Sequence, residues 1–280
     1  MIAGPSTENP AAAAVAGHYD ALDHWYREIW GEHVHHGLFD RGRGDPVAEA
    51  TRRLALHVSD LAGVASGSDV VDVGCGYGAT SRLLTVERGA RTVGFTLSQA
   101  QAVFAAASAP AVDVRVTDWL ANDLPDGRAD AVIAIESLSH MADKPRAFAQ
   151  CARVLRPGGR LVVCDWLARG ERSAWRDRGL LAPICAEGHL PSMHTAAEYS
   201  ALIREAGLRP LAFADRSRVV SRTWTLIAGR VLARLARDAE AREFLLSARN
   251  PERRFAVTVP RLMAAYATRA MVYGIFVAER

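Results

Sequence analysis

Lysine is nearly absent from this chain of 280 residues, in which Lys144 is the only lysine among 34 basic residues. Arginine codons are GC-rich and lysine codons are not, so we attribute this imbalance to a GC-rich genome and not to function. The formal net charge is only +3, which lacks the basic excess typical of nucleic-acid binding, so we expect no nucleic-acid partner. No run of 18 apolar residues is present, and we therefore expect no membrane-spanning helix.

The sequence also lacks cysteine pairs and a secretory signal. No CxxC pair occurs, and the cysteine spacings match no zinc module; the four cysteines are Cys75, Cys151, Cys164 and Cys185. We expect buried free thiols in a reducing compartment. The first basic residue is Arg27, and the apolar run at 11–16 is too short for a signal peptide. These features predict a soluble, cytoplasmic protein without a membrane partner.

Apolar segments with strand character alternate with helical segments between residues 69 and 166. This rhythm predicts an α/β fold, namely a Rossmann-like, doubly wound and mostly parallel sheet of seven strands. We expect the strands at 69–73, 90–96, 112–118, 130–136, 160–166, 209–215 and 271–278. Amphipathic helices are expected at 46–64, 143–156 and 195–207.

The remaining segments surround this single domain, which we place at 18–280. Residues 1–17 are predicted to be a disordered tail because the N-terminus is rich in Pro, Ala, Ser and Asn. The segment 18–40 is dense in aromatics and histidine, and it predicts one or two helices that end near Gly37, acting as a scaffold or as a lid. Helical cap segments are expected at about 168–193 and 216–270, the second inserted before the last strand.

The most informative segment is VDVGCGYG at 71–78, between the first strand and the following helix. Glycines there let the backbone approach a ligand at the carboxyl end of the sheet, although a purely structural turn is an alternative. A phosphate loop requires GxxxxGK[ST], which is absent. A dinucleotide fingerprint requires GxGxxG and an acid after the second strand, where this chain has Thr96. Binding of S-adenosylmethionine remains, with Asp72 preceding the glycines.

Five ordered segments carry a family resemblance: HYD with IWGEHVHHGLF (18–20 and 29–39), VDVGCGYG (71–78), VGFTLSQAQ (93–101), ESLSHMADK (136–144) and RVLRPGGRLVVCDW (153–166). Together they resemble the class I S-adenosylmethionine-dependent methyltransferases. More narrowly, the chain is similar to the group of tocopherol O-methyltransferases and rebeccamycin-type sugar O-methyltransferases. The resemblance implies methyl transfer from S-adenosylmethionine, with S-adenosylhomocysteine as the product.

The resemblance also implies which residues hold the cofactor. The methionine ammonium would be held by Asp72, the loop glycines would pass under the ligand, and Tyr19 would close over its methionine end. The ribose would lie near two side chains, and the adenine would meet an acid and an aromatic ring. The glycines are Gly74 and Gly76, the ribose neighbours Thr96 and Gln101, and the adenine neighbours Asp118 and Trp119.

Three residues are candidates for the chemistry. His140 follows the fourth strand and is our candidate general base, because an imidazole can accept a proton at neutral pH. Asp165 ends the fifth strand and is expected to orient that imidazole, as the matching residues of the group do. The alternative is that His140 caps a helix and Asp165 only terminates a strand. Glu136 is expected to bind the ligand's ammonium or to stabilise a cation if the acceptor is a carbon.

The acceptor is the least readable part of the sequence. An apolar pocket is expected from Trp30, Trp166, Leu190 and Trp224, with Met193 and Phe255. This suits a small hydrophobic specialised metabolite, and we favour O-methylation. Arginines could instead recognise an anionic group such as a diphosphate; these are Arg172, Arg176, Arg218 and Arg222. C- or N-methylation of a prenylated or aromatic natural product, and a cyclase that binds the cofactor without methyl transfer, stay open as alternatives.

Two further questions concern metals and assembly. The histidines His33, His35 and His36 resemble a metal site only superficially, because in a helix they would not face one direction, and we expect no metal. The sequence leaves the oligomeric state open, with a homo-oligomer as one alternative.

Overall fold

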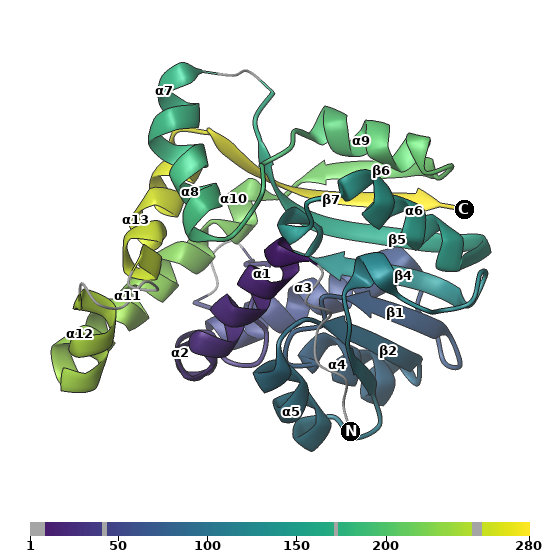
Figure 1. The fold of residues 1–280 in the computed structure, drawn as a ribbon, viewed down its shortest axis with the longest axis horizontal. Coiled ribbons are helices and arrows are strands. Elements are labelled where there is room, and N and C mark those ends of the chain that lie inside the picture. Colours follow the sequence, from purple (N-terminus) through teal and green to yellow (C-terminus); the bar gives the residue numbers. More distant parts are fainter. Residues whose placement is uncertain (1–8, 41–43, 171–172, 248–253) are drawn as a thin grey trace.

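Seven strands form one sheet in the computed structural model, which describes residues 9–40, 44–170, 173–247 and 254–280, the side chains of 245–246 and 254–257 excepted. The strand order is β3-β2-β1-β4-β5-β7-β6, and β7 runs antiparallel to β5 and β6 (Figure 1). The strands are β1 (Asp69–Val73), β2 (Arg91–Thr96), β3 (Asp113–Val116), β4 (Ala129–Ile135), β5 (Leu155–Ala168), β6 (Arg209–Asp215) and β7 (Met271–Glu279). The predicted α/β architecture is confirmed.

The helices divide into those that flank the sheet and those that form the cap. The first set is α3 (Val47–Ala62), α4 (Ala79–Arg88), α5 (Gln99–Ser108), α6 (Lys144–Val154) and α9 (Ala196–Glu205), with the 3₁₀ turns η1 (Trp119–Ala121) and η2 (Leu138–His140). The second set is α7 (Ala174–Arg176), a π-helical stretch η3 (Asp177–Leu181), α8 (Ala182–Glu187), α10 (Ser217–Val220), α11 (Arg222–Arg237), α12 (Ala239–Leu246) and α13 (Arg254–Ala267). The cap helices other than α10 gather at one side of the sheet, on the left of Figure 1.

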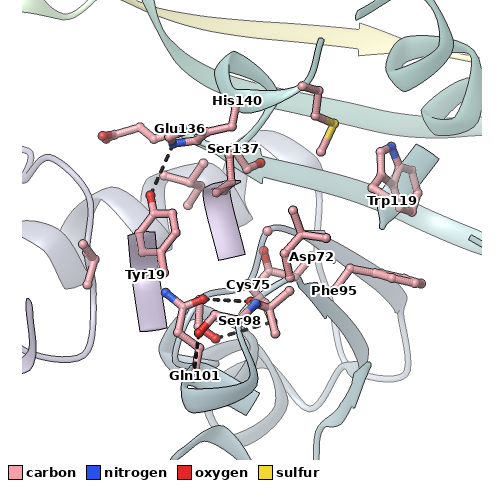
Figure 2. Close-up of a pocket in the computed structure, with 18 of the residues that line it drawn as sticks. Tyr19, Asp72, Cys75, Phe95, Ser98, Gln101, Trp119, Glu136, Ser137 and His140 are labelled. Carbon is pink, nitrogen blue, oxygen red and sulfur yellow. Dashed lines mark hydrogen bonds between the residues drawn. The ribbon is translucent and has the colours of Figure 1, made fainter. Parts of the chain in front are cut away.

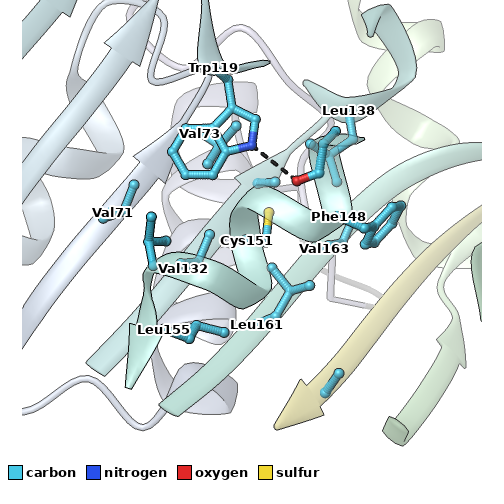
Figure 3. Close-up of a cluster of buried hydrophobic side chains, with 14 of the residues drawn as sticks. Val71, Val73, Trp119, Val132, Leu138, Phe148, Cys151, Leu155, Leu161 and Val163 are labelled. Carbon is cyan, nitrogen blue, oxygen red and sulfur yellow. Dashed lines mark hydrogen bonds between the residues drawn. The ribbon is translucent and has the colours of Figure 1, made fainter. Parts of the chain in front are cut away.

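Both faces of the central strands are buried, which explains why three of the five residues of β1 are valines. Side chains alternate along a strand, so Val71 and Val73 pack on one face in a cluster with Phe148 of α6 (Figure 3). Val70 packs on the other face in a cluster with Leu54 of α3. This packing on both faces holds the carboxyl ends of the parallel strands in fixed register.

The prediction of a disordered tail over 1–17 is wrong for its described part. Helix α1 (Pro10–Ala21) begins inside that range, and the Asn9 side chain caps it by accepting hydrogen bonds from the backbone of Ala11 and Ala12. An asparagine cap, a proline at the first helical position and a run of alanines all favour helix formation. Residues 1–8 lie outside the described residues.

The aromatic segment that follows also ends its helix earlier than predicted. Helix α2 (Asp23–Ile29) stops before Gly31, whose φ of 98° lies outside the helical region, so the expected end near Gly37 is wrong. Residues 31–40 instead run as an extended segment into the interior of the molecule, where His35, His36 and Phe39 are buried. Within the described residues, no helix is long and apolar enough to cross a membrane.

Candidate active site

Two adjoining pockets open at the carboxyl ends of the parallel strands. The first, which we call the glycine-loop pocket, is lined by the loop after β1, the ends of β2 and β4, the turn η1 and helix α1. The second, the aromatic pocket, is lined by side chains from α2, β5, α11 and α13 and by the segment after α8. All eight residues predicted to hold the cofactor line the first pocket. Of the six residues expected to form the acceptor pocket, four line the second, namely Trp30, Trp166, Leu190 and Trp224.

Gly74 and Gly76 of the loop are subject to different steric constraints. Gly74 has a φ of 76°, and a Cβ there would lie 2.3 Å from the Cβ of Ser137. Gly76 has a φ of 55°, but its Cβ would meet no atom closer than Nε2 of Gln101 at 3.9 Å. Gly74 is therefore required by packing against the loop after β4. Gly76 leaves room for a ligand to approach the backbone, as the cofactor prediction requires.

Asp72 is a buried carboxylate beside this loop, at the end of β1. It is 2% exposed, and Oδ2 accepts a hydrogen bond of 2.6 Å from the Ser81 hydroxyl on α4. Burial raises the pKa of Asp72 to about 6, although the hydrogen bonds from Ser81 act in the opposite direction. Among the described residues Asp72 has no basic partner, and a buried acid of this kind in a pocket wall suits a positively charged ligand group such as an ammonium.

The end of β2 presents a paired hydroxyl and amide. The Thr96 hydroxyl donates a 2.7 Å hydrogen bond to Oε1 of Gln101, and both residues are buried in the wall of the glycine-loop pocket (Figure 2). Ser98 caps α5 by accepting from the backbone of Gln101, and its hydroxyl donates to Asp20 of α1. The predicted ribose contacts thus lie together, next to the point where α1 is attached.

The predicted adenine contacts lie at the far end of the same pocket. Oδ1 of Asp118 accepts from the backbone of Leu120, and Oδ2 accepts from the Asn9 side-chain amide at 2.9 Å. Trp119 lines the pocket but is only 2% exposed, and its indole N–H donates to the Ala147 carbonyl. Asn9 is a pocket residue that sequence reasoning missed, because it was assigned to the predicted disordered tail.

The aromatic pocket is walled by three tryptophans in edge-to-face contact. The ring of Trp224 lies 5.3 Å from that of Trp30 and 5.7 Å from that of Trp166. Leu190 closes the wall from the segment after α8. Met193 is buried in the hydrophobic cluster beneath the cap, and the side chain of Phe255 lies outside the described residues.

His140 and Tyr19 lie where the two pockets meet. The Tyr19 hydroxyl is 3.3 Å from Nε2 of His140, and both residues line both pockets (Figure 2). Burial lowers the pKa of His140 to about 4, and the charges of His18, His189 and Lys144 act in the same direction, against a contribution from the His189 backbone. Burial also raises the pKa of Tyr19 well above its usual value. Both groups are therefore neutral at neutral pH.

The expected contact between His140 and Asp165 is not formed. Oδ2 of Asp165 accepts a 2.7 Å hydrogen bond from the Tyr199 hydroxyl, and Oδ1 accepts from the backbone of Trp166. The His140 imidazole instead lies against the Tyr19 hydroxyl and the His189 backbone. Asp165 is fully buried and lines neither pocket. Asp165 lies within β5, three residues before its end, and the predicted direct contact with His140 is wrong.

Glu136 is a buried carboxylate at the same junction, and it already has four donors. Its oxygens accept from the backbone and Nδ1 of His36, from the indole of Trp166 and from the Tyr273 hydroxyl, at 2.7 to 3.0 Å. Burial by itself would raise the pKa of Glu136, but His36 and His35 bring it down to about 2. The φ of Glu136 is 56°, a costly conformation outside glycine. Binding an ammonium there would require displacing one of these donors, so the structure does not favour that expectation.

Two histidines of the segment 31–40, His33 and His35, line the glycine-loop pocket, and sequence reasoning did not place them there. Nδ1 of His33 lies 3.3 Å from Nε2 of His35 and 3.3 Å from the Thr80 hydroxyl. Burial lowers the pKa of both imidazoles, that of His33 to about 3, so neither carries charge at neutral pH. In the part of the chain that the structure describes, no three His, Cys, Asp or Glu side chains are placed to hold a metal ion.

The arginines considered for an anionic acceptor lie elsewhere. Arg218 and Arg222 line a separate, open pocket beside Tyr266. Arg176 lines neither the glycine-loop pocket nor the aromatic pocket, and Arg172 lies outside the described residues. The described lining of the aromatic pocket contains no arginine or lysine. The structure therefore gives no support to recognition of a diphosphate by these residues.

Comparison with known proteins identifies the family. Residues 71–163 match the model of a methyltransferase domain. The chain is 30% identical to the chloroplastic tocopherol O-methyltransferase of Arabidopsis thaliana, over 95% of this chain and 81% of that protein. It is 31% identical to the 27-O-demethylrifamycin SV methyltransferase of Amycolatopsis mediterranei, over 79% and 83%. A probable tocopherol O-methyltransferase of rice is 33% identical, with 64% of its length matched.

Solved structures show the same fold at lower identity. The cyclopropane synthase MmaA2 of Mycobacterium tuberculosis superposes with a TM-score of 0.84 at 19% identity, over 98% of this chain and all of that one. The geranyl diphosphate C-methyltransferase of Streptomyces coelicolor, solved with S-adenosylhomocysteine, gives 0.76 at 23%, over 99% and 100%. The [4+2]-cyclase SpnF gives 0.78 at 24%, over 99% of both chains.

The matched domain covers β1 to β5, which contain the glycine loop, the buried acid before it and the strand ends that line the first pocket. The relatives at 30–31% identity match 79–95% of this chain, well beyond the matched domain. The chain therefore belongs to the class I S-adenosylmethionine-dependent methyltransferases, with S-adenosylmethionine as its cofactor.

Proposed function

We propose that this enzyme methylates a hydroxyl group of a small, neutral and largely apolar acceptor, with His140 as the general base. One observation carries the proposal: the glycine-loop pocket and the aromatic pocket share a wall made of Tyr19, Val34, His35, Glu136 and His140. A donor in the first pocket and an acceptor in the second meet at that wall. Alignment of two bound reactants in this way is a large part of what such an enzyme contributes.

In the glycine-loop pocket, successive strand ends carry residues that would contact the ammonium, the ribose and the adenine of the cofactor in turn. Asp72 faces the pocket as a buried acid and would hold the ammonium. Thr96 and Gln101 would meet the ribose, and Asp118 with Trp119 would meet the adenine. Helix α1 would act as the lid, since Tyr19 lines both pockets and Asn9 reaches Asp118.

The bound cofactor supplies a methyl group on a sulfonium, which is displaced in line and leaves S-adenosylhomocysteine. The chain must exclude water and accept the proton of the acceptor hydroxyl. His140 is placed for this role because Nε2 points to the shared wall, where the Tyr19 hydroxyl contacts it. A pKa of about 4 keeps the imidazole unprotonated at neutral pH, as a general base requires, although it makes His140 a weaker base than a free histidine.

The aromatic pocket suggests the class of acceptor. Three tryptophan rings and Leu190 supply apolar contact area. Its two carboxylates are already engaged, Glu136 with four donors and Glu187 with Thr258 and Arg261. A neutral apolar compound bearing a hydroxyl fits these walls, whereas a polyanion would lie beside two carboxylates and meet no arginine or lysine in the described lining.

The test uses methyl-deuterated S-adenosylmethionine and a panel of neutral phenols, apolar alcohols, aromatic amines and electron-rich aromatic rings. We expect labelled ethers from the hydroxyl compounds, with release of S-adenosylhomocysteine. With the fastest acceptor, His140→Ala should lower kcat by about 10²–10⁴-fold without changing cofactor affinity. Wild-type kcat should fall on an acidic limb near pH 4, and that limb should vanish in the variant. A near-wild-type kcat for His140→Ala would refute the base.

Methylation at carbon is the second candidate, and the anionic Glu136 beside His140 favours it. An activated aromatic or olefinic acceptor passes through a cation, which a buried carboxylate stabilises. In that case Glu136→Gln should lower kcat more than His140→Ala, and the label should appear on carbon. Cyclisation without methyl transfer would be identified by a rearranged acceptor and no S-adenosylhomocysteine.

A further inference from the structure

The only lysine of the chain is fully buried beneath the loop that carries His140. Lys144 begins helix α6 and is 1% exposed, although the chain uses arginine for all its other 33 basic side chains. Burying an ammonium is costly unless its hydrogens are taken up by polar partners. A lysine retained at such a position, in a chain that otherwise avoids lysine, calls for a specific contact that arginine does not make.

The contacts of Lys144 lie on both sides of His140. Nζ donates to the backbone carbonyl of Ser139 at 3.3 Å and to that of Met141 at 3.1 Å. These are the residues immediately before and after His140 in η2 and its cap. The ammonium therefore holds the backbone on each side of the imidazole.

Asp165 supports the same loop from the other side. Its carboxylate lies within hydrogen-bonding reach of the Ser139 side chain. Burial raises the pKa of Asp165 to about 6, while its hydrogen bonds, including that from Ser139, and the charge of Lys144 act in the opposite direction. The Tyr199 hydroxyl and the backbone N–H of Trp166 also donate hydrogen bonds to this carboxylate. The acid that was expected to touch His140 thus acts on the residue before it, and its charge offsets that of Lys144.

We propose that Lys144 is a positioning residue for the methyl transfer, which fixes the His140 imidazole at the shared wall of the two pockets. This inference rests on the proposed role of His140. A compact ammonium with three rotatable hydrogens can reach two carbonyls two residues apart, whereas the planar and larger guanidinium of arginine cannot do so in the same space. The charge of Lys144 also lowers the basicity of His140, together with His18 and His189, while Tyr19 contacts the ring.

The experiment compares Lys144→Met and Lys144→Arg with Arg146→Met, an exposed position on the same helix. With the fastest acceptor, Lys144→Met should lower kcat about 10–100-fold, while the Kd for S-adenosylhomocysteine changes less than about twofold. The pKa of His140, measured by NMR, should rise because a neighbouring positive charge is removed. Lys144→Arg should lower kcat but leave that pKa unchanged, and Arg146→Met should change neither.

The same substitution in the His140→Ala background separates this inference from the proposed function. If Lys144 acts through His140, Lys144→Met lowers kcat no further there. An equal loss in both backgrounds, or an unshifted pKa of His140, overturns the inference alone. A near-wild-type His140→Ala overturns the proposed function and the inference with it. Should Lys144→Met unfold, Lys144→Arg carries the test, and a wild-type kcat in that variant overturns the inference.

Discussion

The two pockets that meet at His140 are built in different ways. The glycine-loop pocket is lined mostly by residues between 72 and 142, at the ends of β1, β2 and β4, and is completed by α1 and residues 32–35. The aromatic pocket is formed by side chains from α2, β5, α11, α13 and the segment after α8, which are distant in the sequence. We infer that changes in the first pocket affect folding and cofactor binding together, whereas changes in the second alter the acceptor and leave the sheet intact.

Substitution of Gly74 should have the largest effect, because its backbone belongs to both the sheet and the pocket. In Gly74→Ala the new Cβ would lie 2.3 Å from Cβ of Ser137, at a φ of 76°. Left-handed strain and overpacking together should lower the free energy of unfolding by about 2–5 kcal/mol. Urea denaturation measures this loss, and a variant as stable as the wild type would show that the loop after β4 can move away.

Gly76→Ala is the matched substitution two residues further on. Its Cβ would meet nothing closer than 3.9 Å, so only the strain of the positive φ remains, at about 1–2 kcal/mol. The methyl group would stand in the space assigned to the ligand, and the Kd for S-adenosylhomocysteine should rise at least about tenfold. Calorimetry on the folded variant decides this, since an unchanged Kd would contradict the assignment of the loop.

The pKa of Asp72 provides a test of its role in ligand binding that requires no added side-chain volume. Its pKa of about 6 means that it is protonated in the free protein at lower pH, whereas an ammonium requires the anion. Each pH unit below 6 should therefore raise the Kd for S-adenosylhomocysteine by about tenfold, with no change above about pH 7. Asp72→Asn should bind weakly and without this pH dependence. The same slope in Asp72→Asn would assign the titration to another group.

The aromatic pocket should respond differently. Trp224→Phe removes the indole that donates to Nε2 of His36 and reduces the contact area, but Tyr266 still contacts that nitrogen. We expect the KM for the acceptor to rise about 3–10-fold, with cofactor affinity unchanged. Trp175→Phe on the exposed surface of α7 is the control. A loss of cofactor affinity in Trp224→Phe would show that the pockets are not independent.

The smallest effect we predict is a change in the hydrogen exchange of α1, the helix whose Tyr19 lines both pockets. Asn9 and Asp20 fasten this helix to Asp118 and Ser98, and Tyr19 faces His140. Hydrogen exchange over residues 10–21 should slow when S-adenosylhomocysteine binds, because a lid is ordered by its ligand. Exchange in α3, which lines neither pocket, serves as the reference. Equal protection of α1 with and without ligand would make it a scaffold.

Local pattern predicted the framework well. Strands β1 and β6 match their predicted bounds, and the other predicted strands overlap those observed. The glycine loop and the strand-end residues line one pocket because successive strands of a parallel sheet end at the same edge. The start of α1 was missed because proline and alanine were read as disorder, although Asn9 supplied a cap.

The hydrogen-bond partners of the buried polar groups could not be predicted from local sequence pattern. His140 follows β4 and Asp165 lies near the end of β5, which suggested a pair, yet Asp165 bonds to Tyr199 on α9. His36 reaches Glu136 because the chain leaves α2 before Gly31 and residues 31–40 enter the interior. Neither contact has a periodic signal, since each joins residues more than 30 positions apart.

By itself, the sequence determined the order of strands and helices, the ligand edge of the sheet and the residues beside the glycine loop, because alternation, capping and backbone freedom are local properties. Tertiary structure decided that Lys144 and Asp165 support the His140 loop from two sides, that Glu136 is surrounded by donors, and that distant tryptophans form one pocket. Buried charges and polar groups must be satisfied by whichever neighbours the packed fold brings to them, and packing of the cap against the sheet selects those neighbours.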